Sequence, residues 1–357
     1  MSRSILILTE DEALLDDLLR LCAAAGAEAE VLPGAPPDAE RWARAPLVLV
    51  GDDRAAARPA PGQWPGRRPG VLLVGRDLDD HTVWERGVAL GVEQVIHLPD
   101  DEPWLADRIA DAVEGPERPA LTVGVLGGCG GAGASTLACA LAVRAARQGR
   151  RTTLIDADPL GGGLDVLLGG EREPGPRWPA FACAQGRLSA AALDESLPRP
   201  HGVSLLSWDR SGLVRLPADA MRSVLTAARR GGGVVVLDLP RAADDAVSEA
   251  LAWLDLGLLV VPGELRPLAA ARQVVGAAGS QVRDLRVVTR MPGGRGLAGA
   301  ELARLLGLPL AGELPEEPGL PAAAERGDPP GRDSGGVLAR FCDALLERAL
   351  PTPEAAA

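Results

Sequence analysis

The feature that most constrains the fold is a glycine-rich segment between an apolar run and a helical pattern. Leu121–Leu126 is an apolar run of the kind found in buried parallel strands, and Ser135–Arg147 carries apolar side chains at helical spacing. A second apolar run, Thr152–Ile155, ends in an Asp-Ala-Asp-Pro sequence that starts at Asp156. These elements predict a strand–loop–helix–strand unit whose glycines let the backbone approach a phosphate at the helix N-terminus.

Two phosphate-binding patterns overlap in this loop. The stretch Gly128–Ser135 reads GCGGAGAS and has the spacing of a Walker A motif, with Ala134 in the place of its lysine. The G-x-G-x-x-G spacing from Gly128 to Gly133 equally fits a dinucleotide fingerprint, with Asp156 close to the position of a ribose-binding acid. A third interpretation is a tight turn that binds nothing, so the loop alone leaves three alternatives.

A later stretch favours the first pattern. The apolar run Val234–Leu237 follows a glycine-rich break and ends in Asp238, which predicts a buried strand with a Walker B acid that holds Mg²⁺ through water. Buried strands also end in Asp for turn geometry alone, so the evidence is the order of the motifs. A dehydrogenase would need an acid–base residue, and none of the three histidines lies in a catalytic pattern.

The composition limits how a phosphate is held. The chain has 357 residues and contains no lysine, so all 37 of its basic residues are arginines. An arginine does not simply replace a lysine, because its planar guanidinium is larger than an ammonium. The net charge of −12 argues against a general nucleic-acid-binding surface. The five scattered cysteines form no zinc pattern and fit a reducing cytoplasm, and no apolar stretch reaches the ~20 residues of a membrane span.

Residues 1–115 are predicted to form a separate α/β domain, because apolar strand candidates alternate with helical patterns. The strand candidates are Ile5–Leu8, Glu28–Leu32, Leu47–Val50, Val71–Val74 and Gln94–Leu98, and the helical patterns are Glu12–Ala25 and Trp104–Val113. This order resembles a response-regulator receiver domain with a flavodoxin-like fold. In that resemblance the acids are Glu10 and Asp11 after the first strand and Asp52 or Asp53 after the third.

The receiver resemblance departs from the family at two positions. Gly75 stands where the family has Ser or Thr, and Leu98 stands where it has the Lys before Pro99. A phosphoryl acceptor needs that lysine charge together with a metal-binding acid cluster. The sequence therefore predicts a pseudo-receiver that serves docking or dimerisation, with a phosphorylated receiver as the alternative.

Residues 121–350 resemble the ParA/MinD group of deviant Walker A ATPases, and more narrowly the actinobacterial CpaE-like septum-site-determining proteins. The stretches that carry the resemblance include GGCGGAGAST, TTLIDADPLGGGLD, GVVVLDLPR and LLVVPGELRPLAAAR. The resemblance implies a P-loop NTPase domain with a doubly wound parallel sheet. It is expected to follow a linker at 116–120 and to precede a disordered tail at 351–357, and Gly169–Pro179 reads as a loop.

The same resemblance implies a site for ATP and Mg²⁺. Asp158 would position the attacking water, Asp156 would support the metal indirectly, and Ser135 and Asp238 would serve the metal. The other residues expected to bind the nucleotide are Gly128, Gly130, Gly131, Ala132, Gly133, Ala134, Thr136 and Arg290.

Three departures from the family concern the nucleotide. Cys129 stands at the position of the family's signature lysine, which reaches the partner's nucleotide. Ala134 stands at the position of the Walker lysine, and Thr289 stands where the family has Asn before Arg290. Loss of one well-placed donor typically costs about 10²–10³ in rate, so we expect weak or absent ATP hydrolysis with binding by the loop amides and Mg²⁺. Arg210 and Arg241 are the candidates to supply the missing charge.

The resemblance implies a regulatory protein of septum-site determination or of pilus or secretion assembly. The alternatives are an active ATPase that uses arginine or a partner's charge, a nucleotide-independent scaffold and, more remotely, a dinucleotide-binding oxidoreductase. The expected partners are proteins of the division, pilus or secretion machinery, with a homodimer possible. The charges of the amphipathic stretch Val337–Leu350 balance, which favours packing on its own domain over membrane binding. We expect a cytoplasmic protein that reaches the inner face of the membrane or the septum only through partners.

Overall fold

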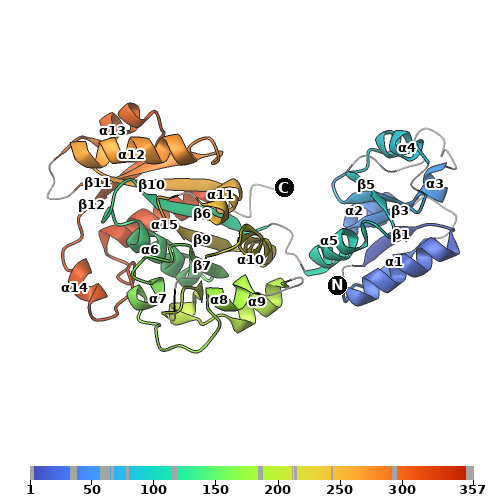
Figure 1. Ribbon diagram of the computed structural model, residues 1–357, viewed down its shortest axis with the longest axis horizontal. Coiled ribbons are helices and arrows are strands. Elements are labelled where there is room, and N and C mark those ends of the chain that lie inside the picture. Colours follow the sequence, from blue (N-terminus) through green and yellow to red (C-terminus); the bar gives the residue numbers. More distant parts are fainter. Residues whose placement is uncertain are drawn as a thin grey trace. The chain divides into compact units, whose positions relative to one another are not determined.

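The computed structural model describes residues 4–32, 38–56, 65, 68–77, 80–114, 119–183, 188–210, 212, 215–242, 244–291 and 296–350. The chain divides into two compact units, Met1–Gly115 and Pro116–Ala357 (Figure 1). The expected linker at 116–120 falls largely outside the described residues, and the expected tail at 351–357 falls entirely outside them.

The N-terminal unit is a five-stranded parallel sheet in the order β2-β1-β3-β4-β5. Its strands are β1 Ile5–Leu8, β2 Ala29–Val31, β3 Val48–Gly51, β4 Val71–Gly75 and β5 Gln94–His97. Its helices are α1 Glu12–Ala24, α2 Ala39–Arg44, α3 Asp52–Ala56, α4 Val83–Leu90 and α5 Glu102–Glu114. This strand order is that of flavodoxin-like folds, and all five predicted strands are present with their ends within one residue.

The C-terminal unit is a seven-stranded parallel sheet in the order β12-β11-β10-β6-β9-β7-β8. Its strands are β6 Leu121–Gly127, β7 Thr152–Asp156, β8 Ser204–Leu206, β9 Val234–Leu239, β10 Leu256–Pro262, β11 Leu285–Met291 and β12 Leu310–Pro315. Its helices are α6 Ala134–Arg147, α7 Leu164–Leu167, α8 Trp178–Ala182, α9 Ala190–Ser196, α10 Ala218–Arg230, α11 Asp245–Ala252, α12 Leu265–Ala278, α13 Gly299–Leu306, α14 Leu320–Ala324 and α15 Val337–Ala349, with a 3₁₀ turn at Pro200–Gly202. The expected loop at Gly169–Pro179 is wrong at its end, because α8 begins at Trp178 and buries that side chain completely.

Two hydrophobic cores cover the two faces of this sheet. One core contains side chains of α6, α7 and α15, and the other contains side chains of α8 to α13. The central strand β6 lies between β9 and β10 in the sheet. Because β9 and β10 are consecutive in the sequence, the chain crosses from one side of β6 to the other as it goes from β9 to β10. Open parallel sheets bind ligands beyond the carboxyl ends of the strands at such a reversal. The glycine-rich loop follows β6 at this point.

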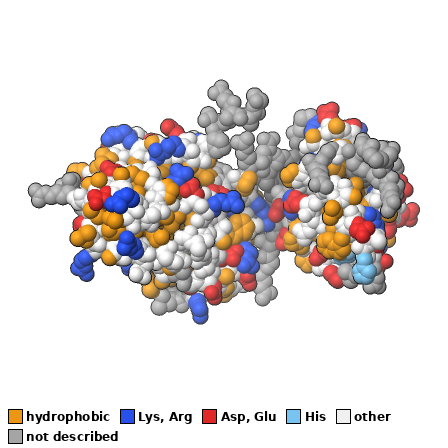
Figure 2. All heavy atoms as spheres, turned by 90° about the horizontal axis from the view of Figure 1, so that it is seen from above, with side chains coloured by type: hydrophobic (Ala, Val, Ile, Leu, Met, Phe, Trp, Pro, Cys, Tyr) orange, Lys and Arg blue, Asp and Glu red, His pale blue; other side chains and the backbone are white. Residues whose placement is uncertain are grey.

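The C-terminal helix α15 packs on its own unit, as the balanced charges predict. Leu338, Cys342, Leu345 and Leu346 are buried in the same core as α6. No helix in the described part of the chain is long and apolar enough to cross a membrane. On the face that Figure 2 shows, the arginine side chains of the C-terminal unit are scattered and do not gather into one basic patch.

An ion pair fixes α15 to α6, and its removal is our first prediction. Arg144 is 9% exposed and donates to both carboxylate oxygens of Asp343, at 2.9 and 2.7 Å, and to Ser334 Oγ at 3.0 Å. Arg144→Ala leaves Asp343 without this partner, so we expect the free energy of unfolding to fall by about 2 kcal/mol in a urea titration. Glu347→Ala, on the exposed side of α15, is the control and should change it by less than about 0.5 kcal/mol. Equal effects of the two substitutions would contradict the role of the pair.

Candidate functional site

The loop between β6 and α6 needs its glycines for two separate reasons. A Cβ on Gly128 would lie 2.8 Å from Val261 Cγ2 and 2.9 Å from Ala271 Cβ, so a side chain does not fit there. Gly131 and Gly133 have φ angles of 70° and 96°, in the left-handed region that glycine adopts without strain. A Cβ on Gly131 would meet nothing within 4 Å, which leaves space beside the loop.

The first turn of α6 is suited to bind an anion. Its N-cap is Gly133, which has no side chain to accept hydrogen bonds from the first amides of the helix. These N–H groups and the helix dipole together favour a negative group at this point. The expected phosphate-binding residues from Gly130 to Thr136 therefore lie together in the loop and the first turn, as a phosphate cradle requires.

Two of the expected acids are neighbours at the carboxyl ends of β7 and β9. Asp156 and Asp238 are paired in the strand register and are 1% and 4% exposed. Burial raises the pKa of Asp238 to about 7, although a hydrogen bond from Ser135 opposes this, and the charges of Asp156 and Asp158 raise it further. The Ser135 side chain, at the start of α6, is thus already hydrogen-bonded to Asp238.

Asp156 is held by a set of donors. Its carboxylate accepts hydrogen bonds from Ser207 Oγ at 2.9 Å, from the Leu164 amide at 3.1 Å and from the Asp158 amide at 3.2 Å. Burial raises its pKa to about 6, and these hydrogen bonds oppose the shift. Asp158 is only half-buried and accepts from the Leu160 amide, so its carboxylate lies at the surface beside the two buried ones.

The donor set suits magnesium only together with a nucleotide. In the residues that the structure describes, no group of three or more His, Cys, Asp or Glu side chains is arranged to hold a metal. Mg²⁺ keeps several waters and is usually bound through one or two protein groups plus phosphate oxygens. The hydroxyl of Ser135 with the carboxylate of Asp238 is such a partial site, and the residues therefore fit Mg²⁺ with phosphates.

Two of the three arginines named from the sequence lie beside the loop. Arg290 on β11 donates from Nη1 to the Gly131 carbonyl at 3.4 Å. The Arg241 Nη2 atom is 3.9 Å from the position that a Cβ on Gly130 would occupy. Arg210 instead donates to both oxygens of the buried Asp165, at 2.9 and 3.0 Å, so its charge is already paired.

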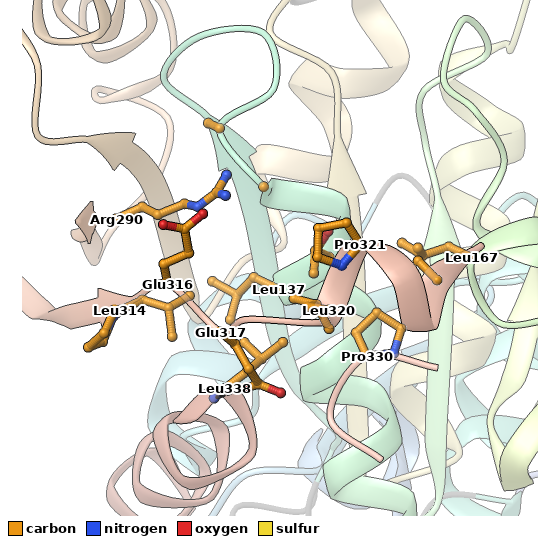
Figure 3. A pocket seen from close by; sticks show the side chains of 15 residues that line it. Leu137, Leu167, Arg290, Leu314, Glu316, Glu317, Leu320, Pro321, Pro330 and Leu338 are labelled. Atoms are coloured by element: carbon orange, nitrogen blue, oxygen red, sulfur yellow. Dashed lines mark hydrogen bonds between the residues drawn. The ribbon is translucent and has the colours of Figure 1, made fainter. Parts of the chain in front are cut away.

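A cavity of about 250 Å³ begins at the first turn of α6 (Figure 3). Gly133 and Thr136 line it next to the loop, Arg290 and Glu316 lie together at one end, and leucines line its interior. The leucines are Leu137, Leu167, Leu314, Leu320 and Leu338. An apolar cavity with a few polar groups next to an anion site has the chemistry to take an aromatic base attached to a phosphate.

Thr289, expected on the base-binding side, is fully buried. Its Oγ1 has no hydrogen-bond partner in the described part of the chain. Three contacts of these acids and arginines were not predicted: Trp178 donates from Nε1 to the Asp156 carbonyl at 2.6 Å, Ser207 donates to the Asp156 carboxylate, and Arg210 pairs with Asp165. None of these has a local sequence signal, because each partner is distant in the chain.

The acids of the N-terminal unit are engaged in local structure. Asp53 accepts from Thr9 Oγ1 at 2.8 Å and from the Glu10 amide at 2.7 Å. Asp11 caps α1 by accepting from two of its amides, and Glu10 pairs with Arg54 at 2.6 Å. Asp52 is half-buried, and burial raises its pKa. At the end of β5 the buried Leu98 brings no charge.

Comparison with known families matches both units. Residues 8–120 match the model described as "Rv3660c-like, CheY-like N-terminal domain". Residues 123–330 match the model of the CobQ/CobB/MinD/ParA nucleotide binding domain. The expected fold class, a receiver-like α/β domain followed by a P-loop domain with a parallel sheet, is confirmed.

Individual relatives agree with these matches. The chain is 38% identical over 311 residues to the uncharacterized protein Rv3660c of Mycobacterium tuberculosis, covering 86% of this chain and 87% of that protein. It is 27% identical over 222 residues to the putative septum site-determining protein MinD of Nephroselmis olivacea, covering 60% of this chain and 81% of that protein.

Solved structures share the fold of the C-terminal unit. A ParA family ATPase from Chlorobium tepidum superimposes with a TM-score of 0.56 at 17% identity, covering 64% of this chain and 99% of that one. The MinD cell division protein of Aquifex aeolicus superimposes with a TM-score of 0.52 at 23% identity, covering 65% of this chain and 99% of that one. The resemblance to the ParA/MinD group that the motifs suggested is confirmed. The chain therefore belongs to the CobQ/CobB/MinD/ParA nucleotide-binding domain family, with a CheY-like domain in its N-terminal part.

Proposed function

We propose that the protein is a nucleotide-dependent regulatory protein that binds ATP and Mg²⁺ in the loop between β6 and α6 and hydrolyses ATP weakly or not at all. One observation carries this proposal. The uncapped N-terminus of α6 presents Ser135, already hydrogen-bonded to Asp238, beside a cavity that accommodates a base. The phosphates would contact the residues from Gly128 to Thr136, and Arg290 would lie between the phosphates and the base.

We expect weak hydrolysis because the loop lacks the two lysine charges of the family. Phosphoryl transfer depends on positioning and on charges that stabilise the transferring group. Cys129 and Ala134 bring no charge to the loop, and the chain has no lysine to do so. Asp158 is the residue that would orient a water, since its half-buried carboxylate lies at the surface next to Asp156.

The N-terminal unit, residues 1–115, would serve as a protein-docking module that is joined by a linker at 116–120 to a nucleotide-binding domain at 121–350. Its Asp53, Asp11 and Glu10 are engaged in hydrogen bonds or ion pairs, and Leu98 replaces the lysine of a phosphorylated receiver. This arrangement supports the pseudo-receiver interpretation over phosphorylation at Asp52 or Asp53.

The process served would be septum-site determination, as the names of the MinD relatives suggest, or the pilus or secretion assembly implied by the resemblance to CpaE-like proteins. The partners would be proteins of that machinery, with a second copy of the chain among them. Location at the inner face of the membrane or at the septum would then come through partners, since α15 packs on its own unit.

Calorimetric titration tests the nucleotide part of this proposal. Purified full-length protein is titrated with ATP, ADP and NAD, each with and without Mg²⁺, and the Ala134→Lys variant is measured alongside. We expect ATP binding that Mg²⁺ strengthens, about 10-fold tighter in Ala134→Lys because one charge-assisted hydrogen bond is gained. Absence of binding by both proteins would leave a nucleotide-independent scaffold, and selective NAD binding would favour a dinucleotide site.

A further inference from the structure

The loop lacks a full charge of its own. A triphosphate brings several negative charges, whereas amide groups and the end of a helix supply only partial positive charge. P-loops add a lysine that reaches the β- and γ-phosphates. The position of that lysine is occupied by Ala134, and no residue elsewhere in the chain is a lysine. Any cation for the phosphates must therefore be an arginine, a metal ion or a group from another molecule.

Arg241 approaches the loop from one side. It follows β9 directly after Leu239 and Pro240, so the same strand that carries Asp238 also brings this arginine to the carboxyl edge of the sheet. Its Nη2 atom lies 3.9 Å from the position that a Cβ on Gly130 would occupy. Its charge also acts on the neighbouring Cys129 thiol, where it opposes the rise in pKa that burial causes. A side chain at position 130 would come between this guanidinium and the loop backbone.

Arg290 approaches from another strand. It lies on β11, its Nη1 is 3.5 Å from the Cβ position of Gly133, and it donates to the Gly131 carbonyl at 3.4 Å. It also lines the cavity beside the first turn of α6 (Figure 3). This long hydrogen bond uses one of the five N–H donors of the guanidinium, so others remain for a ligand.

These two arginines differ from Arg210 in their surroundings. Arg210 is bound to Asp165 through both nitrogens, and that buried carboxylate neutralises it. Among the described residues, neither Arg241 nor Arg290 has a carboxylate within ion-pair distance. The two guanidinium groups therefore flank the loop without a described carboxylate at ion-pair distance, Arg241 directly after β9 and Arg290 on β11. The nearest acid in view is Glu316, which lies beside Arg290 at one end of the cavity (Figure 3). An arginine fork binds phosphate oxygens through paired hydrogen bonds.

We propose that Arg241 and Arg290 together bind the phosphates of the nucleotide and supply, within one chain, the positive charge for binding that the missing lysines would otherwise give. This inference rests on the proposed nucleotide site. It assigns the phosphate charge to two residues from the ends of β9 and β11, and it excludes Arg210 from that role. The affinity for phosphate would then not require a partner's side chain.

The test compares Arg241→Gln, Arg290→Gln and the double variant with the unaltered full chain. Binding of MgATP and of inorganic tripolyphosphate with Mg²⁺ is measured by calorimetry, and melting curves show that each variant is folded. Arg304→Gln is the matched control, because Arg304 is exposed on α13, a helix that packs on the face of the sheet opposite α6. We expect each single substitution to weaken both ligands about 10- to 100-fold, with no change in the control.

The outcomes separate this inference from the function on which it rests. If the unaltered protein binds MgATP and both arginine variants bind it within twofold of that affinity, the inference is overturned while the nucleotide site stands. A loss that appears equally in Arg304→Gln would reflect net charge alone and would also overturn it. If the unaltered protein binds neither ligand, the nucleotide site itself is refuted.

Discussion

Trp178→Ala is expected to lower the free energy of unfolding of the C-terminal unit by about 3–5 kcal/mol, the range typical of large aromatic side chains removed from a core. Trp178 is fully buried, and its ring lies 5.9 Å from that of Trp208. Its Nε1 also donates to the Asp156 carbonyl at 2.6 Å, so the substitution removes both packing and a buried hydrogen bond next to the site. Chemical denaturation followed by circular dichroism measures the change.

A second substitution separates the two contributions of Trp178. Trp178→Phe keeps an aromatic ring in the core but removes the Nε1 donor, and we expect it to cost about 1–3 kcal/mol. A cost for Trp178→Ala no greater than that for Trp178→Phe would mean that the packing of the indole does not stabilise this part of the unit.

Asp238→Asn is expected to stabilise the nucleotide-free and metal-free protein at pH 8, on the order of 1–3 kcal/mol. Burial raises the pKa of Asp238 from its ordinary 3.8 to about 7 in the folded state, so the folded protein carries an unfavourable charge there above pH 7. Asparagine has a similar shape without the charge, and its oxygen can still accept the hydrogen bond from Ser135.

The pH dependence gives this prediction its sign. Between pH 4 and 7 the unfolded chain has released the Asp238 proton while the folded chain retains it, so the folded state binds more protons. The free energy of unfolding therefore falls as the pH rises through this window and levels off above about pH 7. Asp156 acts in the same direction, since its pKa is raised to about 6.

Melting curves from pH 4 to pH 8, without Mg²⁺ or nucleotide, provide the measurement. The unaltered protein should lose stability toward pH 8, and Asp238→Asn should retain only the smaller decline that Asp156 causes. A variant that is less stable than the unaltered protein at pH 8 would contradict the prediction. Stabilisation by Asp238→Asn would fit the proposed function. An acid that destabilises the ligand-free protein is typical of a site where a ligand uses the charge of that acid.

The sequence alone predicted the features that depend on local rules. The glycines of the loop, the strand that carries Asp238 and the strands of the N-terminal unit were identified from the sequence. Apolar periodicity and left-handed turns both produce patterns among neighbouring residues. The absence of the phosphate-binding lysines was also evident, because it needs no structure.

The tertiary structure decided which distant residues meet. It separated Arg241, beside the loop, from Arg210, which is paired with Asp165 45 residues away in the chain. It also placed Trp178 against Asp156 and brought Leu167, Leu320 and Leu338 to one cavity. Motif spacing does not encode such contacts, because they arise when parallel strands from separate parts of the chain align their carboxyl ends and their helices pack over the two faces of the sheet.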